Sequence, residues 1–587
     1  MLSARSILNM ESETKQCQNC KKYFTMEPDD FGFYEKMQIP FPTFCPECRL
    51  IRRMSFLNER TLYKRKCDMT GESIISLFPE DAEVPVYSPK AWWSDSWDAI
   101  SYGQDYDFSR PFFEQFGELL RKVPQFSLQN QYTTLIRTEY VNMGTYDKDC
   151  YLVFNTSHSE ESSFTAFSLR VNKCFDIYYG NKSELCYECQ NINDCHKVCY
   201  SQNCEGCVNV FFSRDLFGCN DCFGSSNLRK KSYYIFNEPY TREAYLEEMK
   251  KYNLSSYTAV EQIKKDVANR MLKFPRRFCE GVRNVEVSGN YMYNSKNARN
   301  SFYVNGLEDG RYCQFVFYKP ARDCYDMTLW GQNATRVYEC MGAGDSQDMV
   351  KFCFDAWSPA INIEYSYHIV APNKNLFGCI GLKNKEYCIL NKQYSKEEYK
   401  KMVEKIKKHM DDMPYVDKRG IVYKYGEFFP SEISLFSYNE SFANSYFPLE
   451  KEEAIKQGFK WKDIPVNKYE ITIKANELPD DIKDVDESIL NQVIECEISK
   501  RAFRITQLEY QFYKQMNIPL PHLHPDERNK NRLKKQNPMK LWHRECICDK
   551  TNHHNHTGKC EVEFETSYAP DRPEIVYCEK CYQQEVY

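Results

Sequence analysis

The chain has 587 residues, of which 28 are cysteine and 15% are aromatic, and its formal net charge is −5 at pH 7. This length predicts several domains, and the slightly acidic balance argues against wrapping of nucleic acid along the whole chain. No apolar run approaches the roughly 20 residues of a membrane span, and "MLSARSILNM" is too short and broken for a secretion signal. We therefore expect a cytoplasmic protein with no membrane contact, whose cysteines hold metal or lie buried as thiols.

The first predicted domain, residues 1–60, contains two CxxC pairs, "CQNC" and "CPEC". Each pair supplies two thiolates from one tight turn, and the spacer between them can bring four sulfurs together around a tetrahedral Zn²⁺. The sequence therefore predicts a structural zinc ion on Cys17, Cys20, Cys45 and Cys48.

Residues 496–546 repeat residues 17–67 without a gap at a constant offset of 479, keeping the Phe, Tyr and Pro positions. In this copy, predicted as a domain over 491–545, Ser499 replaces Cys20, His524 replaces Cys45 and Glu527 replaces Cys48. Cys496 with these residues, and with His522 nearby, would form only a poor structural zinc site. We expect the copy to keep the fold of the module without its metal.

A second zinc ribbon is predicted over 546–587, where "YCEKCY" supplies one clean pair. We take Cys548, Cys560, Cys578 and Cys581 as its ligands, although Cys546 is an alternative to Cys548, and three histidines at 553, 554 and 556 lie close by. The matching segment 61–100 has Ser88 and Ala91 in place of the second pair, so we expect a degenerate ribbon there. The expected cofactor content is about two Zn²⁺ per chain.

Each first module runs into a basic stretch that also contains aromatic residues, a composition typical of phosphate binding. A solvated helix face is the alternative, and the acidic net charge favours it. The candidate nucleic-acid contacts are Arg49, Arg52, Arg53, Lys64, Arg65, Arg528, Arg532, Lys534 and Lys535.

Between the ends, short phrases such as "CYLVF", "CFDIYY" and "CVNVFF" recur about every 12 residues. They predict short strands stacked in a β-solenoid, with two strands per rung and a repeat of about 24 residues. One array is expected over 150–240 and a second over 301–394, the latter with repeat starts that include Cys340 and Cys353.

Helical segments are expected around these arrays: a connector over 101–149, a cap and linker over 241–300, and a cap and connector over 395–490. Thr241 would cap the helix after the first array, and Ser395 with Glu398 would form a capping box after the second. The predicted fold class is mainly β with some α: two β-solenoid-like cysteine and aromatic repeat arrays flanked by tandem zinc-ribbon or treble-clef-like modules.

The solenoid cysteines allow two interpretations. The spacing of Cys186, Cys189, Cys204, Cys207, Cys219 and Cys222 resembles a zinc set. The second array has only single cysteines at its repeat starts, which favours thiols packed in an interior stack. We favour packing and leave the metal alternative open.

The phrases "FYEKMQIPFPTFCPECRLIRR", "NERTLYKRKCDMTGESIIS", "WWSDSWD", "FGCIGLKNKEYCILNKQYSKEEY" and "FETSYAPDRPEIVYCEKCYQQEVY" resemble a set of uncharacterised multi-domain zinc-ribbon proteins that is widespread in candidate-phyla bacteria. The resemblance covers nearly the whole chain and implies zinc but no particular activity. Members of that set often keep four cysteines in the penultimate module and cysteines at the positions of Ser88 and Ala91. This chain departs from the pattern at both places.

Common motifs for nucleotide binding, nucleophilic hydrolysis and zinc peptidase activity are absent from the sequence. We therefore predict a non-enzymatic, zinc-binding scaffold that binds protein partners, with no small-molecule substrate identified. The first alternative is an RNA-binding or ribonucleoprotein-binding protein that uses the basic stretches. A carbohydrate-active β-helix enzyme, with Asp176, Glu188 and Asp194 as its carboxylates, is the less favoured alternative.

Overall fold

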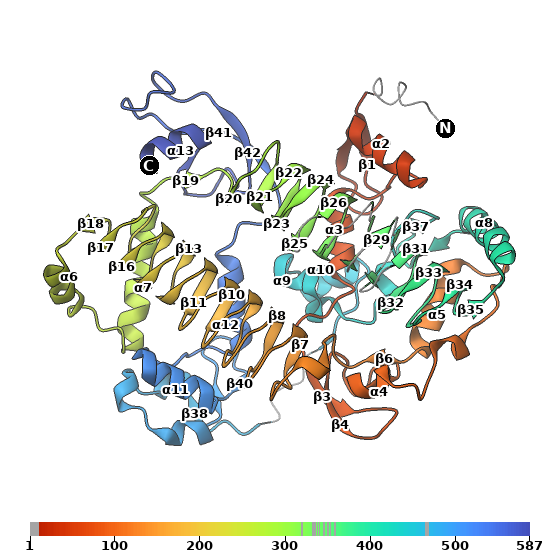
Figure 1. Cartoon of the computed structure of the whole chain (residues 1–587), viewed down its shortest axis with the longest axis horizontal. Helices are drawn as coiled ribbons and strands as arrows, with labels where there is room; N and C mark the ends of the chain where they lie inside the picture. Colours follow the sequence, from red (N-terminus) through yellow and green to blue (C-terminus); the bar gives the residue numbers. More distant parts are fainter. Residues whose placement is uncertain are drawn as a thin grey trace.

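The computed structural model describes residues 11–586 except for 318–320, 332–335, 337, 340, 344–346, 349–350, 353, 357–359 and 464–468. The predicted repeat starts Cys340 and Cys353 lie outside the described residues. The chain is mainly β and contains two arrays of short parallel strands, with smaller hairpin and helix modules around them (Figure 1). This confirms the predicted fold class.

The first array repeats every 12 residues. Strand residues pair in parallel with residues 12 positions further along, as in Val198 with Val210 and Val210 with Cys222. One turn therefore takes 12 residues, and the predicted repeat of 24 is wrong. The strands are β7 (Val141–Thr145), β8 (Val153–Ser157), β9 (Ala166–Leu169), β10 (Phe175–Asn181), β11 (Tyr187–Asn193), β12 (His196–Cys199), β13 (Gln202–Glu205), β14 (Val208–Phe211), β15 (Arg214–Phe217), β16 (Asn220–Phe223), β17 (Ser232–Ile235) and β18 (Glu238–Pro239).

Each turn of this array has four corners. Every third residue has a positive φ, as at Asp176, Tyr179, Lys182 and Leu185, with φ between 47° and 61°. The left-handed conformation is costly for most residue types, so the ladder hydrogen bonds and the packed interior must offset it at each corner. The interior residues also recur every third position, and the narrow four-sided turn favours small side chains there.

The solenoid cysteines are interior packing residues. Cys186, Cys189, Cys204, Cys207, Cys219 and Cys222 are all at most 1% exposed. Cys195 Sγ contacts the Asn193 carbonyl at 3.4 Å, and Ser183 Oγ, one turn earlier, donates to the Asn181 carbonyl at 2.9 Å. Serine and cysteine thus have the same structural role at equivalent interior positions, since each side chain contacts the backbone carbonyl two residues before it. Among the described residues, no group of possible metal ligands comes from these cysteines.

The second array has a less regular turn. Its register is 12 residues between Gly289 and Ser301, 14 between Gln314 and Thr328, and 13 between Phe354 and Tyr367. The strands are β20 (Gly281–Val282), β21 (Gly289–Tyr293), β22 (Lys296–Arg299), β23 (Ser301–Asn305), β24 (Leu307–Arg311), β25 (Gln314–Val316), β26 (Ala321–Tyr325), β27 (Thr328–Trp330), β28 (Met341–Ala343), β29 (Gln347–Asp348), β30 (Phe354–Ala356), β31 (Ala360–Glu364), β32 (Tyr367–Ile369), β33 (Asn373–Phe377), β34 (Glu386–Ile389) and β35 (Lys392–Gln393).

The two arrays touch along one side and run in opposite directions. Phe167 stacks on Phe315 with ring centroids 5.2 Å apart, and Tyr179 stacks on Tyr303 at 5.0 Å. Residue numbers rise along one array as they fall along the other, so the contact is antiparallel. These aromatic stacks join the two arrays, because Phe167 and Tyr179 of the first array pack against the core of the second.

A short antiparallel hairpin and a helix close each array. Thr241 caps α6 (Arg242–Met249), and Ser395 with Glu398 forms the capping box of α8 (Lys396–Asp412), as predicted. Both helices lie beside the last strands of their arrays (Figure 1). The other elements between the modules are η1 (Ala99–Tyr102), α5 (Phe112–Lys122), β6 (Gln125–Phe126), η2 (Tyr132–Thr134), α7 (Tyr257–Met271), β19 (Arg276–Arg277), β36 (Tyr415–Val416), β37 (Val422–Tyr423), η3 (Ser431–Ile433), η4 (Tyr438–Glu440), α9 (Phe442–Tyr446), α10 (Lys451–Lys456), η5 (Ala475–Glu477), η6 (Ile482–Asp484) and η7 (Glu487–Asn491).

Four small modules of one kind, each made of short strands followed by a helix, flank the arrays. The first two are built from β1 (Glu13–Gln16), β2 (Tyr23–Met26), α2 (Pro28–Met37) and α3 (Pro46–Met54), and from β3 (Tyr63–Lys66), β4 (Ser73–Ser76), β5 (Val86–Tyr87) and α4 (Pro89–Trp93). The last two are built from β38 (Ile473–Lys474), β39 (Ile494–Glu495), β40 (Ala502–Phe503), α11 (Gln507–Met516) and α12 (Pro525–Lys534), and from β41 (Trp542–Glu545), β42 (Glu563–Thr566), β43 (Val576–Tyr577) and α13 (Glu579–Val586). In the part of the chain that is described, no helix has the length and apolar character needed to cross a membrane.

Candidate metal centres

The four modules share one local geometry around their first cysteine. A backbone N–H donates to its Sγ at 3.2 Å in every module. The donor and acceptor pairs are Cys45 with Cys17, Ser88 with Cys67, His524 with Cys496, and Cys578 with Cys546. The modules therefore keep one backbone arrangement whether or not the other cysteines are present.

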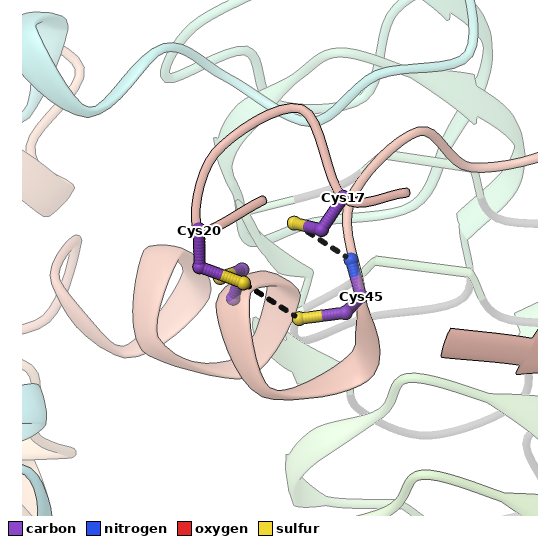
Figure 2. A group of neighbouring side chains, drawn as sticks. Cys17, Cys20 and Cys45 are labelled. Atoms are coloured by element: carbon purple, nitrogen blue, oxygen red, sulfur yellow. Dashed lines mark hydrogen bonds between the residues drawn. The ribbon is translucent and has the colours of Figure 1, made fainter. Parts of the chain in front are cut away.

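The first module brings its four predicted ligands together. One ligand atom from each of Cys17, Cys20, Cys45 and Cys48 lies within 4.8 Å of all the others. Figure 2 shows Cys17, Cys20 and Cys45 converging from the two knuckles, with Cys20 Sγ 3.8 Å from Cys45 Sγ. Tetrahedral Zn–S bonds of about 2.3 Å put neighbouring sulfurs about 3.8 Å apart, whereas a disulfide would bring them to about 2.05 Å. The donor set and its spacing fit a structural zinc ion.

The electrostatics of this cluster favour a bound cation. Hydrogen bonds from the Cys45 and Cys48 thiols lower the pKa of Cys17, and the same contact with Cys17 raises the pKa of Cys45 to about 12. The pKa of Cys48 is raised further still, first by its hydrogen bond with Cys17. Four close thiols therefore cannot all ionise near neutral pH unless a cation offsets their charge.

The C-terminal ribbon uses a different first ligand from the one we predicted. Cys546, Cys560, Cys578 and Cys581 converge within 4.8 Å, and Cys560 Sγ lies 3.9 Å from Cys578 Sγ. Cys548 is not in this group, so its assignment to the four-cysteine site was wrong, and Cys546, the alternative, takes its place. The constant offset of 479 residues aligns Cys546 with Cys67, and this alignment was the sequence signal that favoured Cys546 over Cys548 as a ligand.

The two degenerate modules bring together no such ligand set within the described residues. In the copy, His524 Nδ1 accepts a hydrogen bond from the Asp526 N–H at 3.1 Å and so caps α12. Burial lowers the pKa of His524 to about 4. The His522 ring stacks on Tyr257 with centroids 3.5 Å apart. These side chains have become packing and capping groups.

The three arginines of α3, which follow the Cys45–Cys48 knuckle, are buried. Arg49 and Arg53 share the carboxylate of Asp326 in the second array, with N–O distances of 2.9 and 2.8 Å. Arg52 contacts Glu339 at 2.9 Å and Glu427 at 3.4 Å. These arginines are at most 2% exposed. They fix α3 on the second array and are not available to phosphates.

The copy repeats this contact on the first array. Arg528 and Arg532, the equivalents of Arg49 and Arg53, both pair with Asp176. Phe512 stacks on Phe175 at 4.2 Å, just as Phe33 stacks on Tyr325 at 3.8 Å. The N-terminal module thus clamps the second array, and its copy clamps the first. We call each Arg–Asp–Arg contact an arginine clamp.

The remaining predicted nucleic-acid contacts divide by exposure. Arg65 is buried and pairs with Asp68 at 2.8 Å, whereas Lys64, Lys534 and Lys535 are exposed. Lys535 also contacts Glu188 at 3.4 Å. Of the nine predicted nucleic-acid contacts, only these three lysines are exposed to solvent.

The carboxylates considered for a carbohydrate-active site do not form a free pair. Asp176 is held in its clamp, and Glu188 binds Lys264 at 2.7 Å, while Asp194 lies exposed on another side of the turn. The clamp aspartates were missed from sequence. A signal existed, because Asp176 and Asp326 each follow a cysteine and an aromatic residue, in "CFD" and "CYD".

A cavity of about 840 Å³ opens beside the N-terminal cysteine cluster. Its lining includes the knuckle residues Cys20 and Lys22 and, from a distant part of the chain, Phe447, Lys456 and Phe459. Arg419, which also lines it, donates to Asn19 at 2.7 Å, and Asn19 in turn donates to Cys48 Sγ at 3.4 Å. The cavity is therefore connected to the cysteine cluster by hydrogen bonds.

Comparison with known proteins adds no identity to this geometry. No protein-family model matches the chain, and no curated protein matches it either.

Proposed function

We propose that the protein is a zinc-stabilised scaffold without catalytic activity, which presents its joined arrays and modules to protein partners. The arginine clamp of the N-terminal module carries this proposal. Cys45 is the N-cap of α3, and Cys48 lies within its first turn, so a metal ion on the cysteines would fix the helix that carries Arg49 and Arg53. Zinc bound to these cysteines would thereby stabilise the contact between α3 and the second array.

The donor chemistry supports zinc as the metal. Four thiolates at the spacing of a tetrahedral edge suit Zn²⁺ in a closed, structural site with no open position for a substrate. Two such groups predict about two ions per chain from the four-cysteine sites. We also propose a cytoplasmic location, because none of the described cysteines forms a disulfide and a reducing compartment preserves that state.

The cavity beside the first cysteine cluster supports the binding of a protein partner. Its walls combine apolar side chains with charged ones of both signs, among them Lys22, Lys456, Arg419, Glu47 and Glu453, a mixture suited to a peptide segment with apolar and charged residues. The RNA alternative has weaker support, since six of its nine proposed contacts are buried.

The test compares the zinc-loaded full chain with the Cys45→Ser variant and with the metal-free protein. Metal analysis should find zinc in the wild type, and removal of zinc should make α3 and the strands that it contacts susceptible to protease. Affinity capture from the native cell should retain proteins on the zinc-loaded chain that the stripped chain releases. A wild type without zinc, or equal protease resistance with and without it, would contradict the proposal.

A further inference from the structure

The C-terminal ribbon contains a second group of possible metal ligands beside its four-cysteine site. Cys548, His553, His556 and Cys581 each place a ligand atom within 4.8 Å of the others. Cys581 belongs to both groups. We propose that this module binds two Zn²⁺ ions, the second held by Cys548, His553 and His556, with the Cys581 thiolate bridging the two ions.

An insertion in the first knuckle supplies the new ligands. Two residues separate Cys17 from Cys20 in the N-terminal module, whereas thirteen separate Cys546 from Cys560. Cys548, His553 and His556 all lie within that insertion. The N-terminal module lacks the insertion and lacks a second group among its described residues.

Both histidines are placed for metal binding, and a hydrogen bond on the far nitrogen of His556 fixes its tautomer. His556 Nδ1 lies 2.7 Å from the Gly558 carbonyl oxygen, which can only accept, so Nδ1 carries the proton and Nε2 keeps its lone pair. That Nε2 atom is buried and has no hydrogen-bond partner. A buried lone pair without a partner is costly, and a metal ion would satisfy it.

His553 shows the complementary arrangement. Its Nδ1 lies 3.2 Å from Cys548 Sγ, and its Nε2 lies 3.3 Å from a carboxylate oxygen of Glu585. This Nε2 atom makes no hydrogen bond in the structure, but the nearby carboxylate can accept its proton when Nδ1 binds a metal ion, and that contact would fix the ring and raise the basicity of Nδ1. Both His553 and Cys548 are at most 3% exposed, so water does not replace these partners.

Charge also favours a second ion. The two groups together contain five cysteines, and a single Zn²⁺ would leave most of the thiolate charge uncompensated in a buried cluster. Asn555 donates to Cys581 Sγ at 3.2 Å, which supports a sulfur that carries negative charge. Thiolate and imidazole ligands in a closed, buried site select Zn²⁺ among the common divalent ions.

The experiment counts zinc in the desalted full chain by elemental analysis. The proposal predicts about three ions per chain: one at the N-terminal cluster and two at the C-terminal module. The double variant His553→Gln/His556→Gln should hold about one ion fewer, and the control His554→Gln, at an exposed neighbouring histidine, should lose none. Two ions in the wild type, or an unchanged count in the double variant, would overturn the proposal.

A second variant guards against unfolding of the whole module. If the double histidine variant loses both C-terminal ions, Cys548→Ser decides, because Cys548 is no ligand of the four-cysteine group. Loss of one ion in Cys548→Ser supports the bridged pair, and a full count refutes it. The inference is separable from the proposed function: two ions in the wild type refute only the bridged pair, whereas none refutes both.

Discussion

The arginine clamp on the second array gives the sharpest test of how the modules hold the arrays. In Asp326→Ala, the guanidinium groups of Arg49 and Arg53 lose the carboxylate that they share while staying buried. Removing one partner of a buried ion pair costs about 3–5 kcal/mol. We expect the lower end, because Arg49 keeps the Phe44 carbonyl at 2.9 Å and Arg53 keeps the Thr328 hydroxyl at 3.3 Å.

Hydrogen exchange of the α3 amides, followed by mass spectrometry, measures this loss locally. A loss of about 3 kcal/mol in the opening free energy should speed exchange about 100-fold, since about 1.4 kcal/mol corresponds to a factor of ten. Asp149→Ala is the matched control, because its pair with Arg137 is solvent-exposed and worth at most about 1 kcal/mol. Asp176→Ala should speed exchange in α12 and leave α3 unchanged. If Asp326→Ala changes α3 exchange no more than Asp149→Ala does, the clamp does not hold the module.

Three further changes test other parts of the structure. Cys45→Ser should lower the zinc content, measured by elemental analysis, by about one ion per chain. Cys496→Ser should leave the zinc content unchanged, because the described residues of the copy include no converging ligand set. An equal loss of zinc in the two variants would contradict this assignment. Burial raises the pKa of Glu59 from 4.5 to about 7, so its protonated form stabilises the fold below about pH 4.5 and this contribution is lost as the pH rises through about 7. Glu59→Gln should therefore match the wild type in thermal unfolding near pH 4.5 and exceed it at pH 8, by up to about 3 kcal/mol, and a wild-type advantage at pH 8 would refute the sign. Gly180→Ala would place a methyl group 2.8 Å from Ile177 Cγ2 and 3.1 Å from Val171 Cγ1, which should cost about 1–3 kcal/mol. Gly206→Asn, at a left-handed corner where the nearest atoms to a Cβ lie 3.8 Å away, should cost less than about 1 kcal/mol in the same unfolding assay. Equal losses of stability in the two variants would count against the tight interior.

The sequence predicted the arrays because their cysteines and aromatic residues recur about every 12 residues, but it could not show that one such step is a complete turn. A phrase such as "CFDIYY" has the composition of an ordinary strand, and a corner formed by Tyr179, Lys182 or Leu185 carries no turn signature. These residues adopt the left-handed conformation only because neighbouring turns fix them on both sides. The resulting four-sided turn is a property of the stack and not of a single repeat.

The candidate sites show the same division between local and distant information. The spacing of Cys17 and Cys20 is local, and it sufficed to predict the N-terminal cluster. The partner of Arg49 lies 277 residues away in the chain, so the sequence showed only a basic stretch beside a zinc knuckle. The insertion after Cys546 hid the correct ligand, because no short spacing distinguishes Cys546 from Cys548.

The crossed clamps impose an order of assembly during synthesis. At roughly 5–20 residues per second, the ribosome needs about 15–55 seconds to add the 277 residues between Arg49 and Asp326. Throughout that interval the N-terminal module has no array to bind, and a metal ion is what would let it hold its shape alone. The copy faces no such delay, because Asp176 precedes Arg528 by 352 residues and its array is already made. The copy can therefore fold on the surface of a first array that is already formed. This is consistent with a copy that retains the aromatic residues of the module but has only one of its four cysteines.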